Sequence, residues 1–244
     1  MSDAIDLSEL LPPLEAEVKA VSLEPEPAVK HSRKEHDVYD TDPACALACV
    51  EWLATNGAKD PCRKSPTVLD PCGGSGPFVA AARRVWPSAL IYASDIRPET
   101  EEPLRAAGAN VVSIEDFRAL PLNFVAEMDV TVTNPTFVLA EELIRRWHAG
   151  ARDGAVLALL LNCTFMAGQD RWSDSGLYMI APPLSIAAIV PRPAFLVING
   201  KKTSGKFEAA LFTWIKGYTG EAKWLPPVRW TPERKTRKKR ESKA

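Results

Sequence analysis

The chain has 244 residues, of which 46% are hydrophobic and 25% charged, and its formal net charge is −1. This is ordinary globular composition, enough for one large domain or two small ones. No apolar stretch approaches the roughly 20 residues that a membrane-spanning helix needs, and the acidic N-terminus does not resemble a secretory signal. Five scattered cysteines favour free thiols. We therefore expect a cytoplasmic protein without a membrane partner.

Opposite charges are concentrated at the two ends of the chain. Residues 1–29 hold seven acidic side chains against one lysine, whereas residues 221–244 hold nine basic side chains against three acidic ones. We predict a disordered acidic leader over 1–30, one folded domain over 31–220 and a flexible basic tail over 221–244. Residues 223–243 are a candidate contact for nucleic acid, and a solvated tail that aids solubility fits the charge equally well.

Strand-like and helix-like segments alternate along the domain. Short apolar runs predict strands, and segments with helical spacing predict helices over 77–86, 101–109 and 137–154. The predicted strands are 67–72, 90–96, 110–116, 128–133, 155–163, 184–190 and 208–215. This alternation indicates an α/β fold with a doubly wound, mostly parallel, seven-stranded sheet in a single domain. Residues 162–183 show no clear period and predict a long loop, with or without a short helix, that is a second candidate contact for DNA.

Chemistry-bearing residues follow the first four of these strands. Asp70 precedes the glycines of "DPCGGSG", Asp95 ends the second strand, Asp116 ends the third and Asn134 follows the fourth. In a doubly wound sheet, ligands bind outside the carboxyl ends of the strands. The glycine turn lets a ligand approach the backbone, but it matches neither the dinucleotide pattern nor the phosphate loop.

The three acids favour a particular ligand chemistry. Asp70 would repel a pyrophosphate and suits a cation or a hydroxyl or amino donor, Asp95 would accept from ribose hydroxyls, and Asp116 from an adenine amino group. A nucleoside with a cationic centre in place of phosphates is S-adenosylmethionine. Each acid taken alone fits a helix cap or a turn as well.

Four stretches resemble a known family. "VLDPCGGSG" resembles the first motif of class I S-adenosylmethionine-dependent methyltransferases, and "VTNPTF" resembles the [DNS]-P-P-[YFW] motif of those that methylate amino groups, especially adenine-N6 DNA methyltransferases. "DVYDTDPACALACVEWL" is similar to the D-x-Y-x-T-P-P segment of phage and prophage enzymes, and "PRPAFLVING" with "FTWIKG" to their C-terminal strand and hairpin. The resemblance covers roughly residues 36–218 and implies a Rossmann-like methyltransferase fold.

The resemblance also implies the residues of the site. S-adenosylmethionine would be bound by Tyr39, Thr41, Asp70, Pro71, Cys72, Gly73, Gly76, Asp95, Ile96, Asp116, Phe117 and Asn134, with Tyr39 and Thr41 near its methionine end. The catalytic segment would be Asn134, Pro135, Thr136 and Phe137. The Asn134 side-chain oxygen and the Pro135 carbonyl would accept hydrogen bonds from the target amine, bonds that strengthen in the transition state. Phe137 would stack on a base flipped out of DNA.

Two positions depart from the family pattern and leave alternatives open. Thr136 and Asp42 stand where the family commonly has proline, and Thr136 leaves the catalytic loop less rigid. One alternative is a methyltransferase that acts on RNA or on a protein glutamine amide. Another is a catalytically silent nucleic-acid-binding protein on the same scaffold. The target sequence and the oligomeric state are not predicted.

Two further pairs of residues have simple explanations. Cys45 and Cys49 lie one helical turn apart without further ligands, so we expect no metal site. Trp172 and Tyr178 in the long loop either contact nucleic acid or anchor the loop to the sheet.

Overall fold

The computed structural model describes residues 39–56, 65–193, 196–197 and 208–232. All of them belong to one compact unit, His36–Ala244. The predicted leader, most of the predicted C-terminal hairpin and the greater part of the basic tail lie outside the described residues.

The sheet has seven main strands, in the order β7-β9-β6-β5-β2-β3-β4. They are β2 (Thr67–Asp70), β3 (Leu90–Asp95), β4 (Val111–Ile114), β5 (Val130–Thr133), β6 (Val156–Asn162), β7 (Ser185–Val190) and β9 (Ala209–Ile215). β9 pairs antiparallel with β6 and β7, and the other neighbours pair in parallel. The predicted doubly wound, mostly parallel seven-stranded sheet is therefore confirmed.

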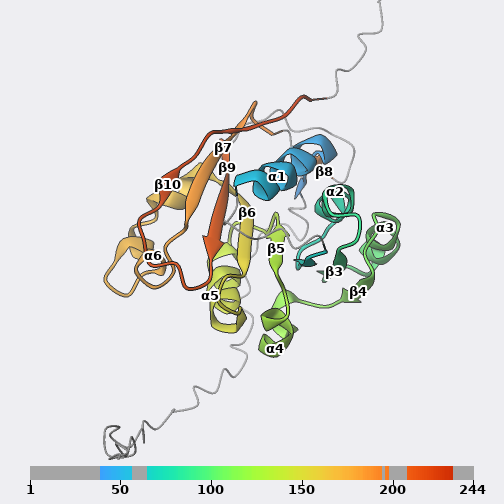
Figure 1. The fold of residues 1–244 in the computed structure, drawn as a ribbon, viewed down its shortest axis with the longest axis horizontal. Coiled ribbons are helices and arrows are strands. Elements are labelled where there is room, and N and C mark those ends of the chain that lie inside the picture. Colours follow the sequence, from blue (N-terminus) through green and yellow to red (C-terminus); the bar gives the residue numbers. More distant parts are fainter. Residues whose placement is uncertain (1–38, 57–64, 194–195, 198–207, 233–244) are drawn as a thin grey trace, which may run out of the picture. The chain divides into compact units, whose positions relative to one another are not determined.

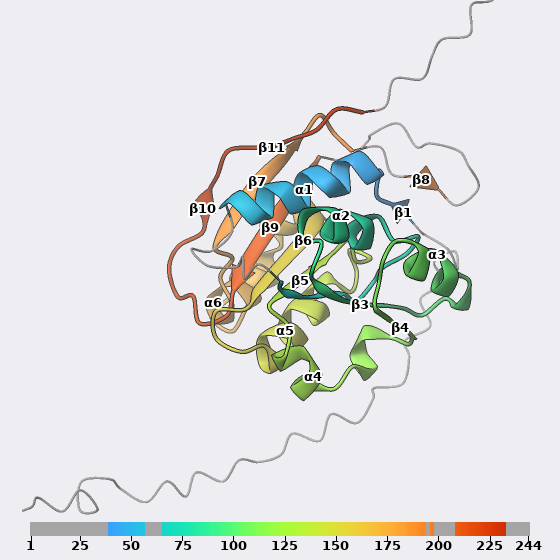
Figure 2. The same ribbon diagram turned by 45° about the vertical axis from the view of Figure 1, so that its right-hand side comes forward.

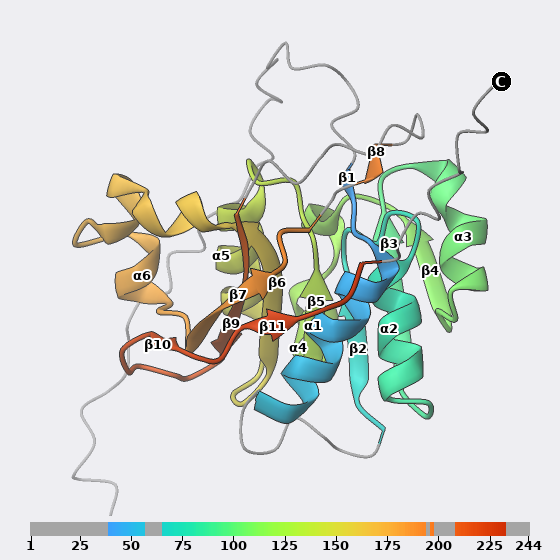
Figure 3. The ribbon, with the colours of Figure 1, turned by 90° about the horizontal axis from the view of Figure 1, so that it is seen from above.

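Four two-residue strands supplement this sheet. β10 (Lys223–Trp224) and β11 (Val228–Arg229) pair in parallel with β7 and follow its outer edge (Figure 2). β1 (Tyr39–Asp40) pairs antiparallel with β8 (Leu196–Val197), and the two lie together near the start of α1 (Figure 3). The edge of β7 is thus covered by the chain itself, which removes an exposed row of unpaired backbone groups.

Helices cover both faces of the sheet (Figure 1). α1 (Pro43–Asn56), α2 (Pro77–Val85) and α3 (Glu101–Ala106) contribute to one core, and α4 (Leu122–Ala126), α5 (Ala140–Gly150) and α6 (Leu177–Ile180) contribute to the other. The central strand β6 explains the division: Ala158 and Leu160 belong to the first core, while Leu157, Leu159 and Leu161 belong to the second. A strand buried on both faces is apolar throughout, as the sequence showed.

Three predicted segments differ in detail from the structure. The helix predicted over 101–109 ends at Ala106. The helix predicted over 137–154 begins at Ala140 and ends at Gly150, because residues 136–139 form a turn in which the Leu139 N–H donates to the Thr136 carbonyl at 3.0 Å. The loop predicted over 162–183 contains two 3-10 turns, η4 (Cys163–Ala167) and η5 (Gln169–Trp172), besides α6. Among the described residues, no helix combines the length and apolar character needed to cross a membrane.

Candidate functional site

The predicted site residues meet where the sheet reverses its order. β2 lies between β3 and β5, and the chain continues from β2 toward β4 on one side and from β5 toward β6 on the other. Asp70 ends β2, Asp95 ends β3, and Asn134 follows β5 directly. Ligands of doubly wound sheets bind at such a switch point. The topology therefore brings these three residues to one edge, as predicted.

The glycine turn is fastened to β3 and pressed against α3. The Gly73 N–H donates to the Ser94 carbonyl and the Gly74 N–H to Asp95 Oδ2, both at 2.9 Å. Gly76 has a φ of +91°, and a Cβ there would lie 2.7 Å from the Cβ of Ala107. Glycine is thus required at position 76 for close packing against Ala107 as well as for its positive φ, and the packing was not predicted.

Asp70 is a buried acid with an unused oxygen. Its side chain is 2% exposed; Oδ1 accepts a long hydrogen bond from the Cys72 N–H at 3.4 Å, whereas Oδ2 has no hydrogen-bond partner among the described residues. Burial, with a smaller contribution from the charge of Asp95, raises the pKa of Asp70 to about 7, although the Thr133 hydroxyl and the Cys72 N–H oppose the rise. A buried carboxylate without a full set of donors fits a site that a cationic or donor group completes.

Two neighbours of Asp70 complete this half of the site. Thr133 is fully buried, and within the described residues its hydroxyl oxygen makes no hydrogen bond of ordinary geometry. Burial and the charge of Asp70 raise the pKa of the Cys72 thiol far above its ordinary value. Cys72 therefore stays protonated at neutral pH and is not a nucleophile.

The other two acids are each paired with an arginine two residues further on. Asp95 Oδ1 accepts from the Arg97 N–H at 3.1 Å and from its Nε at 2.8 Å, and Oδ2 accepts from its Nη2 at 3.1 Å. Asp116 is held in the same way by the backbone N–H and guanidinium of Arg118. Partial burial acts to raise the pKa of Asp116, but the hydrogen bonds and charge of Arg118 lower it below its ordinary value. Two Asp-x-Arg units, 95–97 and 116–118, thus follow consecutive strands.

Asn134 is linked to the segment before α1. Its Nδ2 donates to Thr41 Oγ1 at 3.1 Å, a contact between residues 93 positions apart. Asp42, next to Thr41, caps α1: its carboxylate accepts from the Ala44 N–H at 3.0 Å and its carbonyl from the Ala46 N–H at 2.9 Å. Asp42, which departs from the family pattern, is therefore a normal N-cap residue followed by a proline at the first helical position.

The remaining predicted site residues differ in how far they are exposed. Phe137 is 37% exposed and Ile96 is 65% exposed, so both offer apolar surface to a ligand. Phe117, in contrast, is 5% exposed and belongs to the core beneath α5. Pro135 is buried, and of Tyr39 the structure describes only the backbone pairing with Val197.

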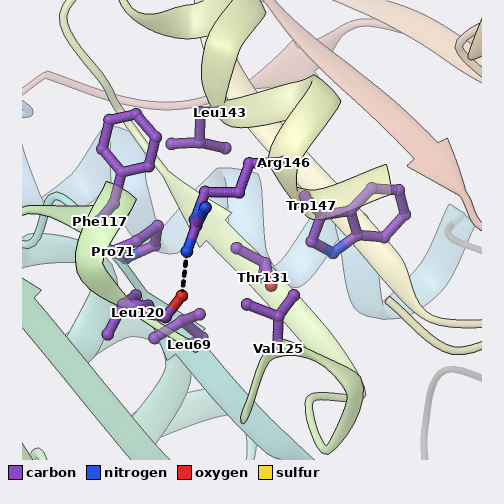
Figure 4. A pocket seen from close by; sticks show the side chains of 9 residues that line it. All are labelled: Leu69, Pro71, Phe117, Leu120, Val125, Thr131, Leu143, Arg146 and Trp147. Atoms are coloured by element: carbon purple, nitrogen blue, oxygen red, sulfur yellow. Dashed lines mark hydrogen bonds between the residues drawn. The ribbon is translucent and has the colours of Figure 1, made fainter. Parts of the chain in front are cut away.

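A small cavity lies behind the site, between α5 and the sheet (Figure 4). Its volume is about 20 Å³, room for about one water molecule. Arg146 spans it and donates to the Leu120 carbonyl, while Thr131 Oγ1 and Trp147 Nε1 lack partners among the described residues. The cavity is too small for a nucleoside, although Pro71 and Phe117 of its lining are among the predicted cofactor-binding residues.

Residues 163–180 border the second core. Tyr178 is buried and donates to the Phe165 carbonyl at 3.0 Å, so it anchors the segment. Trp172 packs on Tyr178 with ring centroids 4.8 Å apart and is nevertheless 61% exposed. Anchoring is thus assigned to Tyr178, and Trp172 keeps an exposed face.

The described cysteines are reduced, and those of α1 are packed in the core. Cys45 and Cys49 are fully buried, and the hydrogen bond between their thiols together with burial raises the pKa of Cys49. Across the described ranges, no group of three or more His, Cys, Asp or Glu side chains is placed to hold a metal ion.

The known proteins that are similar to this chain in sequence are methyltransferases. No family model matches the chain. Trans-aconitate 2-methyltransferase of Rhodococcus jostii (strain RHA1) is 27% identical over 195 residues, which cover 74% of this chain and 71% of that protein. The type II methyltransferase M.XamI of Xanthomonas campestris pv. amaranthicola is 29% identical over 107 residues, which cover 41% of this chain and 19% of that protein.

Solved structures show the same fold. A putative class I S-adenosylmethionine-dependent methyltransferase of Listeria monocytogenes aligns with a TM-score of 0.56 and 11% identity, over 82% of this chain and 68% of that one. A predicted O-methyltransferase of Agrobacterium tumefaciens aligns with a TM-score of 0.51 and 21% identity, over 78% of this chain and 91% of that one.

The chain therefore has the Rossmann-like fold of class I methyltransferases. Fold and relatives support S-adenosylmethionine as the cofactor, as predicted, and methyl transfer as the reaction. The unused oxygen of Asp70 fits the positive charge of that cofactor.

Proposed function

We propose that the chain transfers a methyl group from S-adenosylmethionine to an exocyclic amino group in DNA, namely adenine N6 of a flipped base. The observation that carries the proposal is the position of Asn134. It follows β5 directly, beside the strand that ends in Asp70, and its amide is held by Thr41. An amide at this point can accept a hydrogen bond from a target amine next to the cofactor.

Different residues of the site would bind the cofactor, activate the target amine and stack on the base. Asp70, Asp95 and Asp116 would hold the cofactor through its cationic and hydroxyl or amino donor groups, and the cofactor supplies an activated methyl group. Asn134 Oδ1 and the Pro135 carbonyl would accept from the target amine, which becomes more acidic as transfer proceeds, so these bonds favour the transition state. Phe137, which is partly exposed, would stack on the base.

The course of the C-terminal strands supports a nucleic-acid partner. β11 pairs in parallel with the carboxyl end of β7, where Arg229 lies opposite Val190. β7 runs in the same direction as β6 and β5, because both β6 and β7 are antiparallel to β9. The chain therefore heads toward the edge that carries Asn134, and seven basic residues follow between 234 and 243. A basic tail that starts at this edge suits a phosphate backbone.

The test is mass spectrometry of nucleosides from DNA of mixed sequence, before and after incubation with the protein and S-adenosylmethionine. N6-methyladenine should appear with the wild type and fall at least about a hundredfold with Asn134→Ala, the size of loss seen when an oriented transition-state acceptor or donor is removed. Circular dichroism of Asn134→Ala is the control for folding, and calorimetry measures S-adenosylhomocysteine binding by the wild type. Binding of that ligand by the wild type without methylation of DNA would contradict the proposal.

Exposed carboxylates favour a second candidate, a protein glutamine amide. Glu142 lies in α5, eight residues after Asn134. Asp170 and Asp174 lie on the 163–180 segment, which is joined to α5 by an ion pair of Arg171 with Glu141 at 3.1 Å. Such acids repel phosphates and attract a basic protein. Amino-acid analysis of methylated cell extract separates the candidates, because N-methylglutamine without N6-methyladenine would support this one.

A further inference from the structure

A hydrogen bond between Thr41 and Asn134 joins the segment before α1 to the catalytic loop. We propose that Thr41 is a positioning residue, which holds the amide nitrogen of Asn134 so that the amide oxygen faces the target amine. The inference deepens the proposed function and rests on the role of Asn134 as an acceptor.

The acceptor side of this bond is rigid. Thr41 is 3% exposed and directly precedes the capping residue Asp42, which fixes the first turn of α1. α1 in turn is packed through Cys45 and Cys49, both fully buried. The Thr41 hydroxyl is therefore held by a helix start, and its position does not depend on the catalytic loop.

The donor side needs such a restraint. The two ends of an asparagine amide have nearly the same shape, and a half-turn exchanges the acceptor for two donors. An amide turned the wrong way would present N–H groups to an amine and could not accept from it. A hydroxyl both donates and accepts, so the bond to Thr41 fixes where the amide lies, and in the orientation seen here the amide nitrogen faces Thr41. The backbone of the loop adds little rigidity, because Thr136 has a free φ angle where a proline would fix it.

The test uses Thr41→Val, which removes the hydroxyl at equal size, and Thr41→Ser, which keeps it. Thr213→Val is the matched control, because this threonine is also fully buried and its hydroxyl has no partner among the described residues. We expect kcat to fall about five- to tenfold with Thr41→Val, as for the loss of one neutral hydrogen bond, with KM for the target nearly unchanged. Thr41→Ser should recover most of the rate, and Thr213→Val should not affect it.

Two further readouts distinguish positioning from folding. In protein labelled with ¹⁵N-asparagine, the Asn134 side-chain amide resonances should shift with Thr41→Val and stay near their place with Thr41→Ser, in the absence of any substrate. Thr136→Pro should recover part of the rate lost with Thr41→Val, since it stiffens the same loop from the other side.

Unchanged Asn134 resonances in Thr41→Val, or equal rate losses for valine and serine, would overturn the inference. A failure of the proposed function can be told apart from a failure of this inference. A wild type that methylates neither DNA nor protein refutes that function, while the resonances still decide whether Thr41 holds the amide.

Discussion

The acids at the carboxyl edge of the sheet fall into two regions that differ in how their carboxylates are paired. Asp70, at the end of β2, is buried and has one oxygen without a partner among the described residues, and burial raises its pKa to about 7. Asp95 ends β3 and Asp116 lies two residues beyond β4, and each is paired with an arginine two residues further on. The protein thus leaves one carboxylate incomplete and neutralises the other two.

This difference indicates what each region contributes to the ligand. An incomplete buried carboxylate destabilises the protein and is relieved by a cationic or donor group, so we expect Asp70 to be organised for binding. A paired carboxylate stabilises the empty protein and has to share its lone pairs with a ligand. Substitutions at the three sites should therefore change stability with opposite signs.

Asp70→Asn should give the largest effect. The folded protein holds a proton on Asp70 up to a pKa of about 7, against an ordinary value of 3.8, so the unfolded state gains stability relative to the folded one as pH rises through that range. Removal of the charge should raise the free energy of unfolding by at most about 4 kcal/mol above pH 7, and by little below pH 4. Denaturant unfolding at pH 4, 6 and 8 measures this gain, and S-adenosylhomocysteine binding should be lost.

Asp129→Asn is the control for this change. Asp129 accepts from the Thr67 N–H at 2.8 Å and pairs with Arg152, so the same substitution should destabilise the protein there. A stability loss at Asp70 as large as that at Asp129 would contradict the view of Asp70 as an incomplete carboxylate.

Much of this arrangement could be predicted from the sequence. Apolar runs such as 155–163 identify strands locally, and acids at the ends of such runs meet at one edge because the topology of a parallel sheet requires it. The acid-bearing strand ends, the glycine turn and Asn134 were therefore predictable. The reversed direction of β9 was not, because hydrophobic pattern does not encode strand direction.

What could not be predicted depends on contacts across space. The bond from Thr41 to Asn134 spans 93 residues, and the contact of Gly76 with Ala107 depends on the exact approach of α3. The raised pKa of Asp70 depends on burial, which a sequence does not give quantitatively. One signal was legible and overlooked: the Asp-x-Arg spacing occurs at 95–97 and again at 116–118.

Arg97→Met should give the next largest effect, with the opposite sign in stability. The side chain of Asp95 is 8% exposed and that of Arg97 18%, so loss of the guanidinium leaves a buried carboxylate underpaired and should lower the free energy of unfolding by about 1–3 kcal/mol. The lone pairs released on Asp95 become available to ribose hydroxyls, so S-adenosylhomocysteine should bind a few-fold more tightly. Calorimetry that shows weaker binding would instead assign Arg97 to the orientation of Asp95 for the ligand.

Arg118→Met should give the smallest effect, because the Asp116–Arg118 pair is more exposed than the Asp95–Arg97 pair. The side chains of this pair are 51% and 29% exposed, so solvent screens the interaction and the loss should stay below about 1 kcal/mol. Pairing lowers the pKa of Asp116, so the contribution is present above the ordinary carboxyl pKa and is lost as pH falls through the lowered value. Denaturant unfolding in 1 M salt should abolish the difference between Arg118→Met and wild type. The Arg97→Met difference should persist in the same salt, because the Asp95 pair is shielded from solvent; equal salt sensitivity of the two variants would remove the distinction between them.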